Sequence, residues 1–115
     1  MAMTTSPSQT SPFVQIDDDA RPLLSVADRE CINCFATQIA LQAARSGASI
    51  NRIQVWRWRL IEEPDWVEVI VYLVVEAAPE AALDFGVDAD EIFQACAEQF
   101  GPQEHPPLVL RVDWM

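Results

Sequence analysis

The segment Ile50–Glu76 constrains the fold more than any other part of this chain, because it has the pattern of one long β-hairpin. Its second half alternates strictly, with the period of two that a half-buried strand requires. One side carries Val67, Val69, Val71, Leu73 and Val75, and the other carries Trp66, Glu68, Ile70, Tyr72, Val74 and Glu76. The intervening Glu62-Glu63-Pro64-Asp65 predicts a four-residue turn.

A turn of this length sets the predicted register. It pairs Leu60 with Val67, Trp58 with Val69 and Trp56 with Val71 on a core face. The other side, which we call the outer face, then has Arg59 opposite Glu68, Arg57 opposite Ile70, Val55 opposite Tyr72 and Ile53 opposite Val74. A slip of one residue would send both tryptophans to the outer face and break the Arg59–Glu68 pair.

One helix is predicted before the hairpin, and a second helix, preceded by a short helical segment, is predicted after it. Ser25 and Asp28 form a capping-box pattern that predicts the start of a helix. Gly47 is a suitable stop for this helix. After the hairpin, Pro79–Phe85 has the pattern of a short helix that Gly86 ends. Asp88 then predicts the N-cap of a separate helix that reaches Gly101.

The order of these elements predicts an α+β fold. Leu108–Trp114 alternates as a last strand. If Phe13–Ile16 also pairs, the order becomes βαββαβ, as in ferredoxin-like folds. We expect a two-layer sandwich, in which two helices pack on one face of an antiparallel sheet. Residues 1–12 are expected to form a flexible polar tail and not a signal peptide, and 13–115 a single domain.

The composition excludes several function classes. The net charge is −11 and the chain has no lysine, which argues against nucleic-acid binding and against a P-loop. The three glycines stand singly, so no glycine-rich phosphate loop is present. The longest apolar run is far shorter than a membrane span. We expect a protein of the cytoplasm without cofactor, nucleic-acid or membrane partner.

The cysteines provide an alternative. Cys31 and Cys34 have the spacing of a dithiol that binds a metal or cycles through a disulfide. Because both fall well inside the predicted helix, away from the helix start that favours a thiolate, we expect them to be small core residues. A zinc site would need Cys96 and His105 in addition.

The outer face is the predicted functional surface. It combines apolar and arginine side chains in a patch of a kind that often marks a partner surface. We therefore expect an adaptor-, chaperone- or inhibitor-like interaction module that binds a protein partner or forms a homodimer. The alternative is a small-ligand or metal-binding, redox-active domain that uses Cys31 and Cys34. No residue pattern indicates catalysis. The interface residues predicted from the sequence are Ile53, Val55, Arg57, Arg59, Ile70, Tyr72, Val74 and Arg111.

Overall fold

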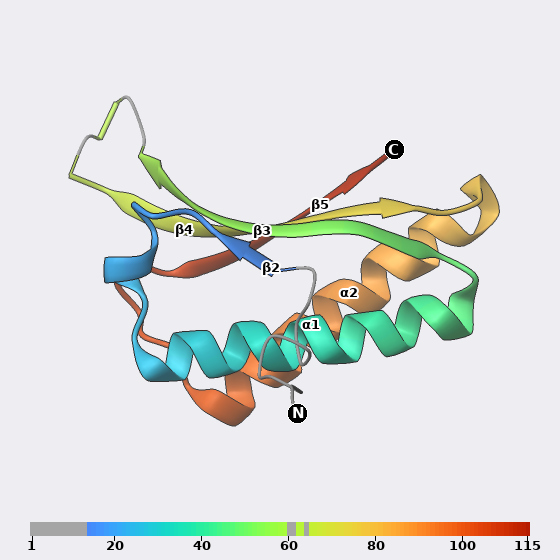
Figure 1. Ribbon diagram of the computed structural model, residues 1–115, viewed down its shortest axis with the longest axis horizontal. Coiled ribbons are helices and arrows are strands. Elements are labelled where there is room, and N and C mark those ends of the chain that lie inside the picture. The colour runs from blue at the N-terminus through green and yellow to red at the C-terminus, as the bar shows by residue number, and fades with distance from the viewer. Residues whose placement is uncertain (1–13, 60–61, 64) are drawn as a thin grey trace, which may run out of the picture.

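The computed structural model describes residues 14–59, 62–63 and 65–115 (Figure 1). The predicted tail, residues 1–12, lies outside this range, and so do Phe13 of the predicted first strand, Leu60, and Pro64 of the predicted turn. The elements run in the order β2 (Val14–Ile16), a 3₁₀ turn (Arg21–Leu23), α1 (Val26–Ser46), β3 (Ser49–Arg59), β4 (Val67–Glu76), α2 (Pro79–Phe100) and β5 (Leu108–Trp114). The molecule is thus α+β, as the sequence predicted.

The four strands form one sheet in the order β2-β3-β4-β5. The hairpin pair β3–β4 is antiparallel, but β2 is parallel to β3 and β4 is parallel to β5. The prediction of an antiparallel sheet was therefore wrong. The ferredoxin-like order is not confirmed either, because that arrangement splits its βαβ units, whereas here each crossover helix connects neighbouring strands.

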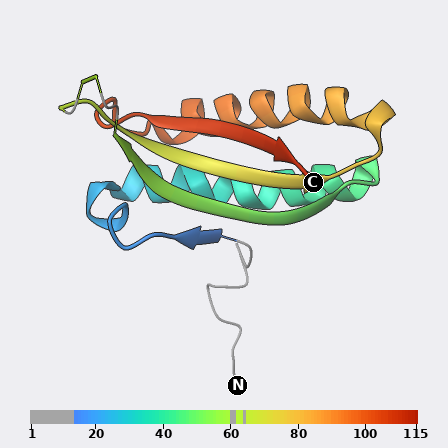
Figure 2. The same cartoon turned by 90° about the horizontal axis from the view of Figure 1, so that it is seen from above.

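Both helices lie side by side against the same face of the sheet, and the opposite face is open to view (Figures 1 and 2). The core fills the space between the two helices and the sheet. Phe35 of α1 meets Phe93 of α2 edge to face, with ring centroids 5.4 Å apart. The sheet contributes apolar residues from alternate positions, all fully buried: Ile53, Val55, Val69, Val71, Leu73 and Val75. No helix of the described residues is long and apolar enough to cross a bilayer.

The ends of α1 are those that the sequence predicted. Ser25 is the N-cap, its hydroxyl accepts a hydrogen bond from the N–H of Asp28, and the Asp28 carboxylate accepts one in return from the N–H of Ser25. Gly47 ends the helix at φ 73°, a left-handed conformation that glycine adopts without strain. The second oxygen of the fully buried Asp28 carboxylate accepts the N–H of Gln103, at 2.9 Å.

The predicted break between two helices after the hairpin was wrong. Residues Pro79–Phe100 form one continuous helix, and Gly86 lies inside it. Asp88 is not an N-cap. Its carboxylate accepts a hydrogen bond from Nε2 of Gln42, at 2.9 Å, and so connects α2 with α1. The longer helix buries more apolar surface against the sheet and α1, and this burial outweighs the local preference for a cap at Asp88.

The predicted hairpin register was wrong by one residue. Trp58 lies opposite Glu68, Trp56 opposite Ile70 and Val55 opposite Val71. Strand β4 presents the predicted sides to the core and to the outer face, but β3 is reversed. The two tryptophans therefore lie on the outer face, the Arg59–Glu68 pair does not form, and the smaller Ile53 and Val55 pack beneath the helices.

Candidate functional site

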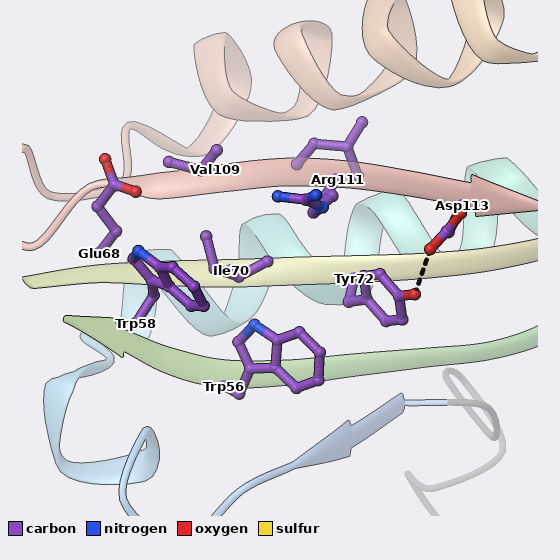
Figure 3. A pocket seen from close by; sticks show the side chains of 9 residues that line it. Trp56, Trp58, Glu68, Ile70, Tyr72, Val109, Arg111 and Asp113 are labelled. Carbon is purple, nitrogen blue, oxygen red and sulfur yellow. Dashed lines mark hydrogen bonds between the residues drawn. The ribbon is translucent and has the colours of Figure 1, made fainter. Parts of the chain in front are cut away.

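The outer face contains a groove of about 450 Å³ that crosses β3, β4 and β5 (Figure 3). Most of its lining side chains come from alternate positions of these strands, which is why they share one side of the sheet. The lining residues are Trp56, Trp58, Glu68, Ile70, Tyr72, Val109, Leu110, Arg111 and Asp113. We call this feature the outer-face groove.

Aromatic rings form one wall of the groove. The indole of Trp56 stacks on the ring of Tyr72, with centroids 4.9 Å apart and 21° between the planes. The guanidinium carbon of Arg52 lies 5.8 Å from the centre of the Tyr72 ring, in the range of a cation–π contact. Trp58 stands at the other end of this wall and is 49% exposed. The wall is a ready-made apolar surface at the edge of solvent.

The floor of the groove is apolar and largely covered. Ile70 is only 7% exposed although neither helix lies over it, because the side chains of Trp56, Trp58 and Arg111 surround it (Figure 3). Nε1 of Trp56 is buried and has no hydrogen-bond partner among the residues that the structure describes. An unsatisfied donor of this kind is uncommon in folded proteins, and an acceptor brought by a bound molecule would satisfy it.

A hydrogen bond between the strands fixes the far end of the groove. The Tyr72 hydroxyl donates to the Asp113 carboxylate at 2.6 Å (Figure 3). This bond raises the pKa of Tyr72, and together with the Trp114 N–H it lowers the pKa of Asp113 below its usual value. Both shifts favour the pair in which tyrosine is protonated and aspartate ionised.

The two carboxylates of the groove accept hydrogen bonds, whereas its arginine is not in an ion pair among the described residues. Glu68 accepts a hydrogen bond from Nε1 of Trp66, at 3.1 Å, and Asp113 accepts the Tyr72 hydroxyl. Within the described part of the chain, the ion pair that the structure contains is Arg21–Asp18, remote in sequence from the groove. Arg111 therefore projects into the groove without a carboxylate at ion-pair distance among these residues (Figure 3).

The eight residues predicted as an interface divide between the two faces of the sheet. Ile70, Tyr72, Val74 and Arg111 lie on the outer face as predicted. Ile53 and Val55 are fully buried on the opposite, helix-covered face, because the register of β3 is shifted. Arg57 and Arg59 follow them on that side of β3 and are exposed toward the hairpin end.

Sequence reasoning missed the residues that give the groove its character. The predicted core includes Trp56 and Trp58, and the predicted interface does not include Asp113. The available signal was the alternation in Ile53-Gln54-Val55, which favours a buried side that excludes both tryptophans. A second hollow, of about 720 Å³, lies between α2 and β5 and includes the exposed Leu83 and Val87 next to Trp114.

The cysteines come together in a pairing that their spacing did not predict. Cys34 of α1 meets Cys96 of α2, with their Sγ atoms 2.8 Å apart, and Cys31 is buried one turn earlier. The ring of His105 packs edge to face against the ring of Trp66, with centroids 5.5 Å apart. Among the described residues, no three Cys, His, Asp or Glu side chains are grouped as metal ligands would be. The predicted alternative of a metal site gains no support from this arrangement.

Comparisons with known proteins add no relative to this description. No protein-family model, curated protein or solved structure matched the chain. The candidate site is therefore interpreted from its own geometry.

Proposed function

We propose that this protein is a non-enzymatic interaction module that self-associates through the outer face of its sheet. The observation that carries the proposal is the outer-face groove itself, where a stacked Trp56–Tyr72 pair and a half-exposed Trp58 lie on a sheet face that neither helix covers. Tryptophan, tyrosine and arginine are the residues most enriched where protein contacts concentrate their binding energy.

The charges around the groove favour a second copy of this chain as the occupant. The chain as a whole carries −11, so two copies repel each other over most of their surfaces. Near the groove, however, Arg52 and Arg111 stand beside Glu68 and Asp113, and the local charge is balanced. A two-fold contact here brings Arg111 of each copy toward the carboxylates of the other and leaves the acidic surfaces apart.

The aromatic wall supplies the apolar centre of such a contact. Burying half-exposed tryptophan rings on both copies removes apolar area from water on each side of the two-fold axis. Carboxylates and arginines then lie at the rim, as in many interfaces with an apolar centre and a polar edge. The buried Nε1 of Trp56 would gain an acceptor if a polar group of the second copy reached it.

Trp58→Glu is the sharpest test, because it places a charge within the aromatic wall of the proposed contact on a side chain that solvent already reaches. Leu41→Glu is the matched control, since Leu41 lies on α1 and is 50% exposed, against 49% for Trp58. Light scattering coupled to size exclusion, over a range of concentrations, measures the molar mass of each form. We expect a dimeric wild type, a dimeric Leu41→Glu protein and a monomeric Trp58→Glu protein.

Circular dichroism of all three forms establishes that the monomers are folded. A wild type that stays monomeric at the highest concentration would contradict self-association. A Trp58→Glu protein that remains dimeric while folded would exclude the outer-face groove as the contact, and Leu83→Glu in the hollow beside Trp114 would then be the next variant.

A further inference from the structure

The three cysteines of this chain form a cluster between the helices that the proposed function does not use. Cys34 and Cys96 are 62 residues apart in sequence, yet their Sγ atoms lie 2.8 Å apart. Both are free thiols in this structure. Burial, and then the neighbouring Cys34, raises the pKa of Cys31, and burial, then Cys34 and then Cys31, raises the pKa of Cys96.

We propose that Cys34 and Cys96 are a site of reversible disulfide formation that covalently joins α1 to α2. A disulfide has an S–S distance of about 2.05 Å, so the two sulfur atoms of this pair, now 2.8 Å apart, would close by only ~0.8 Å. The helices that carry them already pack together through Phe35, which directly follows Cys34, and Phe93, which lies one turn before Cys96. The site is independent of the outer-face groove.

The dithiol suggested by sequence spacing is a different pair. Cys31 and Cys34 are three residues apart on one helix, whereas the short sulfur contact is between Cys34 and Cys96. Of the three thiols, only Cys34 is partly exposed, and Cys31 and Cys96 are buried. An oxidant in solution therefore reaches Cys34 first, and Cys96 is positioned to resolve the product.

The reaction with a small disulfide such as oxidised glutathione is balanced in two steps. The thiolate of Cys34 attacks one sulfur of glutathione disulfide, and a mixed disulfide forms as one glutathione thiolate leaves. The Cys96 thiol then loses its proton, its sulfur attacks Sγ of Cys34, and the second glutathione leaves. Two protein thiols are oxidised and one glutathione disulfide is reduced to two glutathione molecules.

The surroundings of Cys96 set the rate of the second step. With Cys34 as a free thiol, burial, followed by the hydrogen bond to Cys34, raises the pKa of Cys96 to about 12, and burial, the largest cause, still acts when Cys34 is in the mixed disulfide. Its thiolate is therefore scarce at neutral pH, and its fraction grows about tenfold for each unit of pH until the pKa is approached. The resolving step should accelerate in the same proportion over this range.

Peptide mapping after equilibration with glutathione disulfide tests the site. Trypsin cleaves after Arg29, Arg45, Arg59 and Arg111, so Cys31 and Cys34 leave together in peptide 30–45 and Cys96 leaves in peptide 60–111. We expect these two peptides linked under non-reducing conditions, free thiols falling from three to one per chain, and a melting temperature higher by roughly 10 °C or more.

Two variants identify the linked atoms. Cys31→Ala should keep the linked peptides, and Cys96→Ala should lose both the link and the rise in melting temperature. Peptide 30–45 with an internal disulfide, disulfides between chains, or three thiols that persist under the oxidant would each overturn the proposal. If Cys96→Ala does not fold, the wild type and Cys31→Ala still decide, because they distinguish every pairing.

Discussion

The hydroxyl of Tyr72 on β4 donates a 2.6 Å hydrogen bond to the carboxylate of Asp113 on the neighbouring β5. The two residues are not directly opposite, because Tyr72 pairs with Arg111 and Val74 with Asp113, so the bond runs diagonally across the strands. It links the last strand to the hairpin at the end of the outer-face groove, and its dependence on pH follows from the two pKa shifts.

Tyr72→Phe should return the pKa of Asp113 toward its ordinary value, because the largest cause of its depression is the tyrosine hydrogen bond. The return should be partial, since the N–H of Trp114 still donates to the same carboxylate. NMR titration of the side-chain carboxyl carbon measures this pKa directly. An unchanged value would show that the Tyr72 hydroxyl does not stabilise the ionised form in solution.

The same pair predicts a window of pH in which it stabilises the fold. Asp113 has a lowered pKa in the folded state, so its contribution is present above the ordinary aspartate pKa and is lost as pH falls through the lowered one. Tyr72 has a raised pKa, so its contribution is present below the ordinary tyrosine value and is lost as pH rises through the raised one. Urea unfolding of wild type and Tyr72→Phe should therefore differ most at neutral pH.

Ile53→Ala should cost far more stability than Trp58→Ala, although it removes the smaller side chain. Ile53 is fully buried beneath the helices, and its truncation leaves a cavity that costs about 2–5 kcal/mol. Trp58 is half exposed on the outer face, and we expect its truncation to cost about 1 kcal/mol. Chemical unfolding of both variants, at a concentration where the protein is monomeric, compares them. The opposite ranking would mean that the hairpin has the other register.

Gly86→Ala should stabilise the protein by about 0.5–1 kcal/mol. Gly86 lies inside α2. Glycine is less favourable than alanine in a helix because its backbone loses more conformational entropy when the chain folds. A Cβ at this position would lie 3.5 Å from the Trp114 ring, an ordinary van der Waals contact. Ala95→Gly, at an exposed position of the same helix, is the inverse control and should lose a similar amount. A destabilised Gly86→Ala protein would show that Trp114 packs against α2 too tightly for a methyl group.

Local signals predicted the ends of α1 but placed a break inside α2 that does not exist, and features that depend on distant packing could not be predicted. The cap of α1 at Ser25 and its stop at Gly47 are local, and both predictions were confirmed. The register of the hairpin depends on the number of residues between the last paired positions. Among the described residues the last pair is Arg59 with Val67, whereas a four-residue turn implied that Leu60 pairs with Val67. A change of one residue in this connection reverses the side on which every residue of β3 lies.

The strand order and the cysteine pair were beyond local reasoning for a related physical reason. Each crossover helix here returns its strand beside the previous one, and the local pattern of a helix does not distinguish this from a return one place further along the sheet. The contact of Cys34 with Cys96 arises from the packing of the two helices against each other. The spacing of Cys31 and Cys34 could only suggest a pair within one helix.

The two hydrogen bonds of the buried Asp28 carboxylate have a consequence for folding while the chain is being synthesised. One of its oxygens bonds within the first turn of α1, but the other accepts the N–H of Gln103, 75 residues later. A growing chain emerging from the ribosome exposes Asp28 long before Gln103 exists, so α1 cannot complete the bonding of this charge during most of translation. We therefore expect the start of α1 to be buried only after nearly all of the described chain has been made.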